Sequence, residues 1–252
     1  MQKHHNGYPR MLLITAIALA ASLSQTVARA SDSEKGSAKV ICLGDSITGQ
    51  PNLARYLKWS SVLECMYDGA KGEGAVRVLN RGIGGDTTEG ALKRLQRDVL
   101  DENPNVVVIM LGGNDAGQKR QQADVKADLS RIVQKCTAVG AKVLLLQYAM
   151  IPNPAQPGKA WTHLDDNNDL IAEVAKSEGV GLLDIAAAMN TALKNQRVTE
   201  LTGRQNGIAK WETKRLSQEY LVSPIDGVHL SPAGELVFAR AIFKKLAVLG
   251  WL

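Results

Sequence analysis

The chain alternates short, continuously apolar segments with longer stretches in which apolar residues recur every three or four positions. The short segments are rich in β-branched residues and too short for helices, so each predicts a buried strand. They cover residues 40–43, 76–79, 106–111, 143–146 and 181–183. Strands that are apolar on both faces are typical of a parallel sheet covered by helices on both sides.

The longer, periodic stretches predict helices between those strands. They cover residues 53–68, 88–100, 123–139 and 164–177, and a last helix begins at Ser231 and Pro232, which suit an N-cap and a first helical position. This alternation predicts an α/β fold, a three-layer α/β/α sandwich around one parallel sheet. A chain of 252 residues can bury the core of such a fold as a single domain, which we expect over residues 31–252.

Two stretches do not fit the alternation. Residues 152–159 contain three prolines, and residues 195–222 separate the last predicted strand from the last helix. Both follow the carboxyl side of the sheet, where open α/β folds bind ligands. They are candidates for substrate-contacting loops or a partial lid, and ordinary surface loops are the alternative.

The first thirty residues resemble a targeting segment. Lys3 and Arg10 precede the apolar run 11–23, and small residues flank Arg29 at the spacing of a signal-peptidase site. The run is shorter than the roughly 20 residues that a membrane span needs. We therefore expect a secretory signal peptide over residues 1–30, cleaved near Ala30, with export to the periplasm or the exterior and no membrane span in the mature protein. A retained N-terminal anchor is the alternative.

Removal of this leader changes the charge and the histidine count. Lys3, Arg10 and Arg29 leave with it, which lowers the formal net charge from +5 to +2. The basic balance is therefore no argument for nucleic acid or an anionic membrane as a partner. Of the four histidines, His163 and His229 remain, so any histidine chemistry uses one of these two.

The three cysteines are too few for a disulfide framework in a chain of this size. Cys42 lies inside the first predicted strand, and Cys136 continues the apolar series of a predicted helix. Both are expected in the core, whereas one disulfide involving Cys65 stays open.

Polar and glycine-rich segments follow the first three predicted strands. They are residues 44–46, which include Ser46, residues 80–87, which include Gly85, and residues 112–115, which include Asn114. The carboxyl ends of parallel strands open on one edge of a sheet, so we expect these segments to converge there. A serine nucleophile with backbone and amide N–H donors around it is what acyl transfer requires.

The base and its orienter are found near the far end of the chain. His229 follows Asp226 by three residues, so the pair can supply a general base and the carboxylate that orients it. Asp184, after the last predicted strand, is a rival orienter. Each site residue also has a structural interpretation: Ser46 and Asn114 as cap or turn residues, Gly85 as a turn former, and His229 as a packed core residue. One site explains all of them together.

These blocks resemble the SGNH hydrolases, also called the GDSL esterase and lipase family. The matching residues are Ser46 in Gly44-Asp45-Ser46-Ile47-Thr48, Gly85 in Gly84-Gly85-Asp86-Thr87, Asn114 in Gly113-Asn114-Asp115 and His229 in Asp226-Gly227-Val228-His229. The resemblance implies a flavodoxin-like sheet of five parallel strands in the order 2-1-3-4-5, a shallow exposed site, and no metal or organic cofactor. It also implies a Ser46, His229 and Asp226 triad, with an oxyanion hole formed by the N–H groups of Ser46 and Gly85 and the Asn114 amide.

The sequence says less about the substrate. With two phenylalanines and no extra apolar hairpin, the chain offers little material for a long acyl groove, which favours short acyl groups. Export adds glycan esters as targets, and Trp161 and Trp211 lie in or beside the irregular stretches, where they can stack on a sugar. His163 is expected to be a solvated first-turn residue, with substrate contact as the alternative.

The leading hypothesis is therefore a secreted esterase for O-acetyl groups on carbohydrates or for other short-chain esters. A lysophospholipase or an acyl thioesterase is the alternative. A catalytically degenerate glycan-binding protein on the same fold is the non-enzymatic alternative.

Overall fold

The computed structural model describes residues 36–148, 164–193, 197–205, 208–215, 221 and 229–252. Its largest sheet has five parallel strands in the order β2-β1-β3-β4-β5, which confirms the predicted fold class and strand order. The strands are β1 Ala38–Gly44, β2 Val76–Gly82, β3 Val106–Met110, β4 Lys142–Gln147 and β5 Gly181–Asp184. The first three strands therefore lie side by side, with β1 in the middle.

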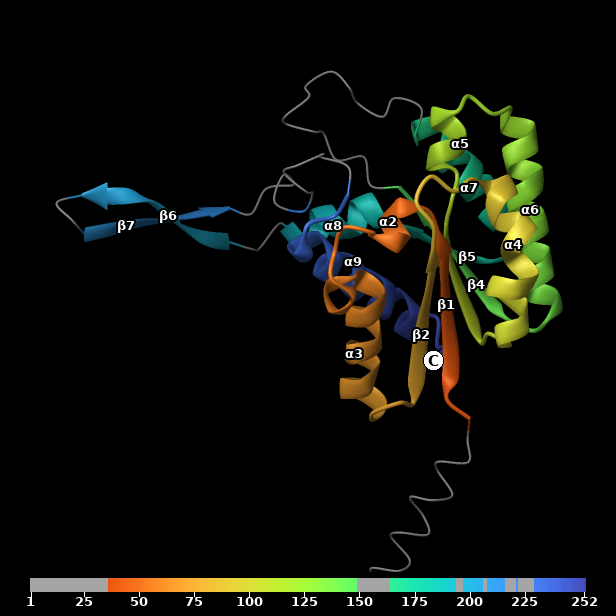
Figure 1. Cartoon of the computed structure of the whole chain (residues 1–252), viewed down its shortest axis with the longest axis horizontal. Helices are drawn as coiled ribbons and strands as arrows, with labels where there is room; N and C mark the ends of the chain where they lie inside the picture. The colour runs from red at the N-terminus through yellow and green to blue at the C-terminus, as the bar shows by residue number, and fades with distance from the viewer. Residues whose placement is uncertain (1–35, 149–163, 194–196, 206–207, 216–220, 222–228) are drawn as a thin grey trace, which may run out of the picture. The chain divides into compact units, whose positions relative to one another are not determined.

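Helices cover both faces of this sheet (Figure 1). One layer holds α3 Trp59–Lys71, α8 Ile185–Leu193 and α9 Pro232–Val248, and the other holds α4 Thr88–Asp98, α6 Gln122–Ala138 and α7 Leu164–Glu178. Short helical segments stand between these elements: α2 Ser46–Gly49, η1 Arg55–Leu57, η2 Leu100–Glu102 and α5 Gly113–Gly117. The arrangement is the predicted three-layer sandwich.

The centre of the core is formed by β1 and β3. Every residue of β3 and the run from Val40 to Leu43 in β1 is buried, as expected for strands covered on both faces. Trp59, at the start of α3, is fully buried and packs against Phe238 of α9 with ring centroids 5.4 Å apart. These contacts fix one helical layer on the sheet that carries the candidate site.

The prediction that residues 195–222 form an irregular stretch was wrong in part. This stretch contains a two-stranded antiparallel hairpin, β6 Arg197–Gln205 and β7 Ile208–Arg215, with a register irregularity between Leu201 and Gly203. Both strands are mostly polar, so this is not the apolar hairpin whose absence favours short acyl groups. The helix predicted from residue 53 also begins later, at Trp59, because η1 and the extended Lys58 come before it.

All three cysteines lie in the described part of the chain and are free thiols. Cys42 and Cys136 are buried as predicted, whereas Cys65 is exposed and forms no disulfide. Among the described helices, none has the length and hydropathy that a bilayer span requires.

Candidate active site

Ser46 stands at the carboxyl end of the central strand β1, as the first residue of the short helix α2. Asp45 caps this helix, because its Oδ1 accepts a hydrogen bond from the Ile47 N–H at 2.9 Å. Gly44 is required before it: a Cβ at Gly44 would lie 2.1 Å from Thr48 Oγ1 and 2.8 Å from the Met110 carbonyl oxygen. The turn that presents Ser46 is therefore fixed by close packing on both sides.

The backbone of α2 rests directly on the end of β2. A Cβ at Gly82 would lie 2.2 Å from the Gly49 nitrogen, so the two backbones touch with no side chain between them. Asn80 holds the same contact, since its Nδ2 donates to the Thr48 carbonyl at 2.6 Å and to Ser60 Oγ at 2.9 Å. The short helix α2, which begins with Ser46, thus packs against β2 as well as β1.

The Asp45 carboxylate carries an interaction that the sequence analysis missed. The Tyr148 hydroxyl donates to Asp45 Oδ2 at 2.6 Å, and both side chains are buried, with 3% of Asp45 and 2% of Tyr148 exposed. Burial raises the pKa of Asp45 to about 6, although the hydrogen bonds from Tyr148 and Ile47 and the charge of His229 oppose the rise. No local pattern pairs residues 103 positions apart, so only the fold shows this contact.

Gly85 lies in the turn between β2 and α4. Its φ of +76° is a left-handed conformation that favours glycine, and the Asp86 N–H closes the turn on the Ile83 carbonyl at 3.2 Å. The Asp86 side chain forms a nearly buried ion pair with Arg94 of α4 at 2.7 Å. Arg94 also donates to the Gly44 carbonyl at 3.3 Å, which connects this turn to the strand end before Ser46.

Asn114 lies in α5, directly after β3. Its Nδ2 donates to the Asp86 carbonyl at 2.9 Å, so the asparagine segment and the Gly85 turn are held together. The two preceding glycines allow the backbone to turn and pack closely here. Gly112 has a φ of +115°, and a Cβ at Gly113 would lie 2.9 Å from the Tyr148 ring. The segments that follow the three adjacent strands therefore meet as the sequence predicts.

Asp115, next to Asn114, has a structural role. It is fully buried, and its carboxylate accepts from the Thr88 N–H at 3.0 Å and the Thr88 hydroxyl at 2.7 Å. Arg120 pairs with Asp115 and with Asp128 of α6. This network fixes α5, and with it Asn114, to the start of α4.

His229 lies just ahead of α9, whose N-cap Ser231 accepts a hydrogen bond from the Gly234 N–H at 3.2 Å. A positive charge on its imidazole would oppose the rise in the Asp45 pKa, so the two side chains lie close enough to interact. His229 therefore approaches the nucleophile turn from the other end of the chain.

The remaining predicted site residues divide into two groups. Asp184 is exposed, and its Oδ1 accepts a hydrogen bond from the Ala187 N–H at 2.9 Å, which caps the start of α8. Asp226, Trp161 and His163 lie outside the described residues, and for Trp211 the structure describes only its place in β7.

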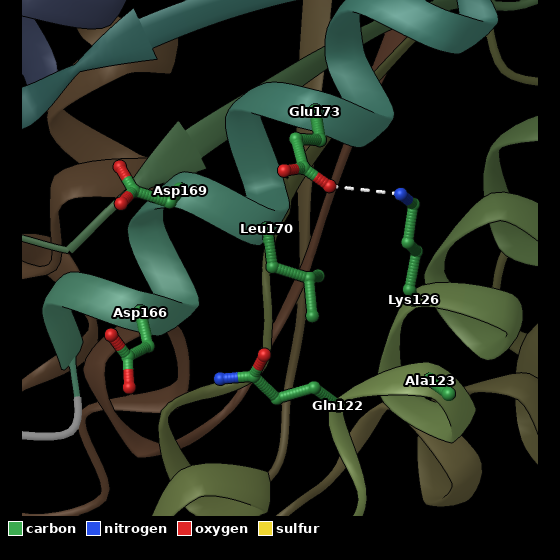
Figure 2. A pocket seen from close by; sticks show the side chains of 7 residues that line it. All are labelled: Gln122, Ala123, Lys126, Asp166, Asp169, Leu170 and Glu173. Atoms are coloured by element: carbon green, nitrogen blue, oxygen red, sulfur yellow. Dashed lines mark hydrogen bonds and ion pairs between the residues drawn. The ribbon is translucent and has the colours of Figure 1, made fainter.

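A separate surface pocket lies between α6 and α7 (Figure 2). Its lining comes from the start of α6 and from the first three turns of α7: Gln122, Ala123, Lys126, Asp166, Asp169, Leu170 and Glu173. Lys126 Nζ and Glu173 Oε2 are 2.8 Å apart and join the helices across the pocket. None of the predicted catalytic residues lines it.

Comparison with known proteins gives one matching family model. Residues 42–236 match the GDSL-like Lipase/Acylhydrolase family. The esterase TesA of Pseudomonas aeruginosa is 37% identical over 119 residues, which are 45% of this chain and 56% of that protein. The chain thus spans little more than half the length of this relative. The acetylxylan esterase of Geobacillus stearothermophilus is 24% identical over 181 residues, which are 68% of this chain and 72% of that protein.

Solved structures give the same fold. The crystal structure of TesA matches with a TM-score of 0.60 and 26% identity over 84% of this chain and 99% of that one. The acetylxylan esterase Axe2 matches with a TM-score of 0.63 and 23% identity over 84% of this chain and 96% of that one. The likeness to Axe2, at this identity, supports the fold alone.

Proposed function

Because the chain belongs to the GDSL-like lipase/acylhydrolase family, we propose that it is a serine esterase that hydrolyses carboxylic esters. Ser46 is the nucleophile, His229 is the general base and Asp226 orients the imidazole. The N–H groups of Ser46 and Gly85 and the Asn114 amide bind the oxyanion. Relatives named as esterases support this activity.

The hydrogen bond between Asn114 Nδ2 and the Asp86 carbonyl carries this proposal. It joins the two predicted donor segments at 2.9 Å, on the strands that flank the strand of Ser46. An amide nitrogen has two hydrogens, so the bond to Asp86 leaves one for the oxyanion. Donors fixed in this way before substrate binds need no reorganisation as charge develops.

The reaction proceeds in two halves. Ser46 Oγ attacks the ester carbonyl carbon while His229 takes the hydroxyl proton, and His229 then returns the proton to the departing alcohol. Water attacks the resulting acyl-enzyme by the same route and releases the acid and free Ser46. The Asn114 amide and the two backbone N–H groups stabilise the negative oxygen in both halves.

For the substrate, we propose short acyl groups, with O-acetyl groups on carbohydrates first. The relative named as an acetylxylan esterase supports this class. A lysophospholipase or thioesterase is the alternative, supported by a relative in Escherichia coli named thioesterase 1/protease 1/lysophospholipase L1, which is 29% identical over 122 residues. Initial rates on an ester series from acetyl to palmitoyl distinguish them, and a preference for long chains rejects the acetyl ester proposal.

Labelling tests the nucleophile. A fluorophosphonate reagent is expected to modify the purified protein at Ser46 and to leave Ser46→Ala unmodified. A screen over acetylated sugars, with the same variant as the control, then identifies the substrate. A folded wild-type protein that is not labelled and that binds glycans without hydrolysing esters would support the non-enzymatic alternative.

Export is part of the proposal. The leader over residues 1–30 directs the chain out of the cytoplasm, and cleavage near Ala30 leaves Ser31 at the new amino terminus. Amino-terminal sequencing of the protein from the periplasm or the medium tests this, and an intact leader on the active protein contradicts it.

A further inference from the structure

Tyr148 reaches the nucleophile turn from β4, a strand that supplies no predicted catalytic residue. It follows the last residue of β4, and its hydroxyl donates to Asp45 Oδ2 at 2.6 Å. The other oxygen of the same carboxylate accepts the Ile47 N–H of α2 at 2.9 Å. Both carboxylate oxygens are therefore held, one by the nucleophile helix and one by Tyr148.

The pair is placed to act on the reaction without touching the substrate. With 3% and 2% of their surfaces exposed, Asp45 and Tyr148 are covered by protein. Asp45 directly precedes Ser46 and is in electrostatic reach of His229. A negative charge there stabilises the imidazolium that forms when His229 takes the serine proton.

We propose that Tyr148 is a positioning residue for ester hydrolysis, which fixes the Asp45 carboxylate directly before Ser46 and favours its charged form. This inference rests on the proposed esterase function. A hydrogen bond donated to a carboxylate stabilises its charged form, so the tyrosine opposes the burial that favours the neutral acid. Without the hydroxyl, Asp45 would take up a proton nearer to neutral pH, and the imidazolium would lose its neighbouring charge.

Two other carboxylates, Asp86 and Asp115, act on the Asp45 and Tyr148 pair. Asp86, in the turn after β2, opposes ionisation of Asp45 but is itself paired with Arg94. Asp115 of α5 acts on the Tyr148 hydroxyl, whose pKa lies well above its usual range because of burial and the Asp45 charge. Tyr148 therefore stays a neutral donor across the working pH range, and Asp45 is the group of the pair that titrates.

The experiment measures kcat and KM between pH 4.5 and 9 for the wild type, Tyr148→Phe and Tyr67→Phe. Tyr67 is the matched control, because it is also buried and its hydroxyl has no hydrogen-bond partner among the described residues. For Y148F we expect the acid limb of kcat to move up by about one to two pH units, with KM changed less than about twofold. Y67F should follow the wild type.

A second variant keeps the inference testable if Y148F does not fold. Asp45→Asn retains a carbonyl oxygen for the Ile47 N–H but never carries the charge, so kcat should fall above about pH 6, where the wild-type carboxylate is ionised, and come close to the wild-type value at pH 4.5, while KM stays the same. Wild-type kcat in D45N above about pH 6, or an acid limb in Y148F that is unchanged or moves to lower pH, overturns the proposal. If wild-type protein neither hydrolyses esters nor labels at Ser46, the failure lies with the proposed function instead.

Discussion

Asn114 combines a structural contact with the chemistry proposed for it. One hydrogen of its amide is used by the Asp86 carbonyl, which orients the group and leaves the other hydrogen for the reaction. A side chain with a single N–H or O–H hydrogen could make only one of these two hydrogen bonds. The residue type is therefore suited to this position for a reason that the sequence pattern alone does not give.

Replacement of Asn114 by alanine should lower kcat by about 10²–10³, because one oxyanion donor is lost. Steady-state kinetics on a short-chain ester measure this, and circular dichroism checks that the fold is kept. Since Ser46 and His229 are untouched, fluorophosphonate labelling of Ser46 should persist at a reduced rate. A kcat near the wild-type value would remove Asn114 from the oxyanion site.

The sequence predicts individual site residues where chemistry follows a strand end. Ser46, Gly85 and Asn114 are found in this way, because the carboxyl ends of adjacent parallel strands must converge. The contacts of Asp45 with Tyr148 and of Asp115 with Thr88 are not predictable, since a buried carboxylate can be satisfied by any donor that the fold brings to it. The structure places the described residues, but the catalytic and oxyanion roles of Ser46, Gly85, Asn114, Asp226 and His229 stay predictions.

At the scale of elements, α2 depends on close contact between backbones. Gly82→Ala places a methyl group 2.2 Å from the Gly49 nitrogen, so α2 must move away from β2. We expect a large loss of kcat and a lower melting temperature. Gly84→Ala is the control, because no atom lies within 4 Å of a Cβ there and its φ is ordinary. Equal kinetics for the two variants would contradict this account of α2.

Glu235 in the first turn of α9 makes stability depend on pH. It is fully buried, and burial raises its pKa to about 8 even though it accepts a hydrogen bond from the Trp59 N–H of α3. The folded protein thus keeps a proton that the unfolded chain releases above about pH 4.5. The protonated side chain therefore adds to the free energy of unfolding at low pH, and this contribution is lost as pH rises from about 4.5 through 8.

Glu235→Gln should remove this pH-dependent loss of folding stability, because the amide is neutral at every pH and can still accept a hydrogen bond from the Trp59 N–H. The gain in stability relative to the wild type should be small at pH 4.5 and on the order of 4 kcal/mol above pH 8. Chemical denaturation across this range measures it. Glu89→Gln, at an exposed first-turn glutamate of α4, should show no such rise, and a pH-independent difference for E235Q contradicts the mechanism.

The β6 and β7 hairpin was missed although its sequence contains a hairpin signal. Asn206-Gly207 stands between the two strands, and this dipeptide is typical of a two-residue hairpin turn. The strands themselves are mostly polar, so no continuous apolar run marks them in the sequence. The five core strands were found because burial on both faces demands continuous apolar runs, a condition that a polar hairpin does not have to meet.

For the whole molecule, the three thiols report on global folding. Burial raises the pKa of Cys136 to about 12 and that of Cys42 further, whereas Cys65 is exposed. A thiol reagent should therefore modify one cysteine in the native protein and all three in denaturant. Cys65→Ser should reduce native labelling to none. Rapid labelling of two or more native thiols would show that the core opens without complete unfolding.

The packing of α2 against β2 determines how the protein should lose activity on heating. Since the helix that carries Ser46 contacts the β2 backbone and is held by Asn80, we expect it to unfold together with the β1 and β2 pair. Catalytic activity and secondary structure should then disappear along one temperature curve, with no folded but inactive species between them. The protein would lose its nucleophile only by losing its sheet.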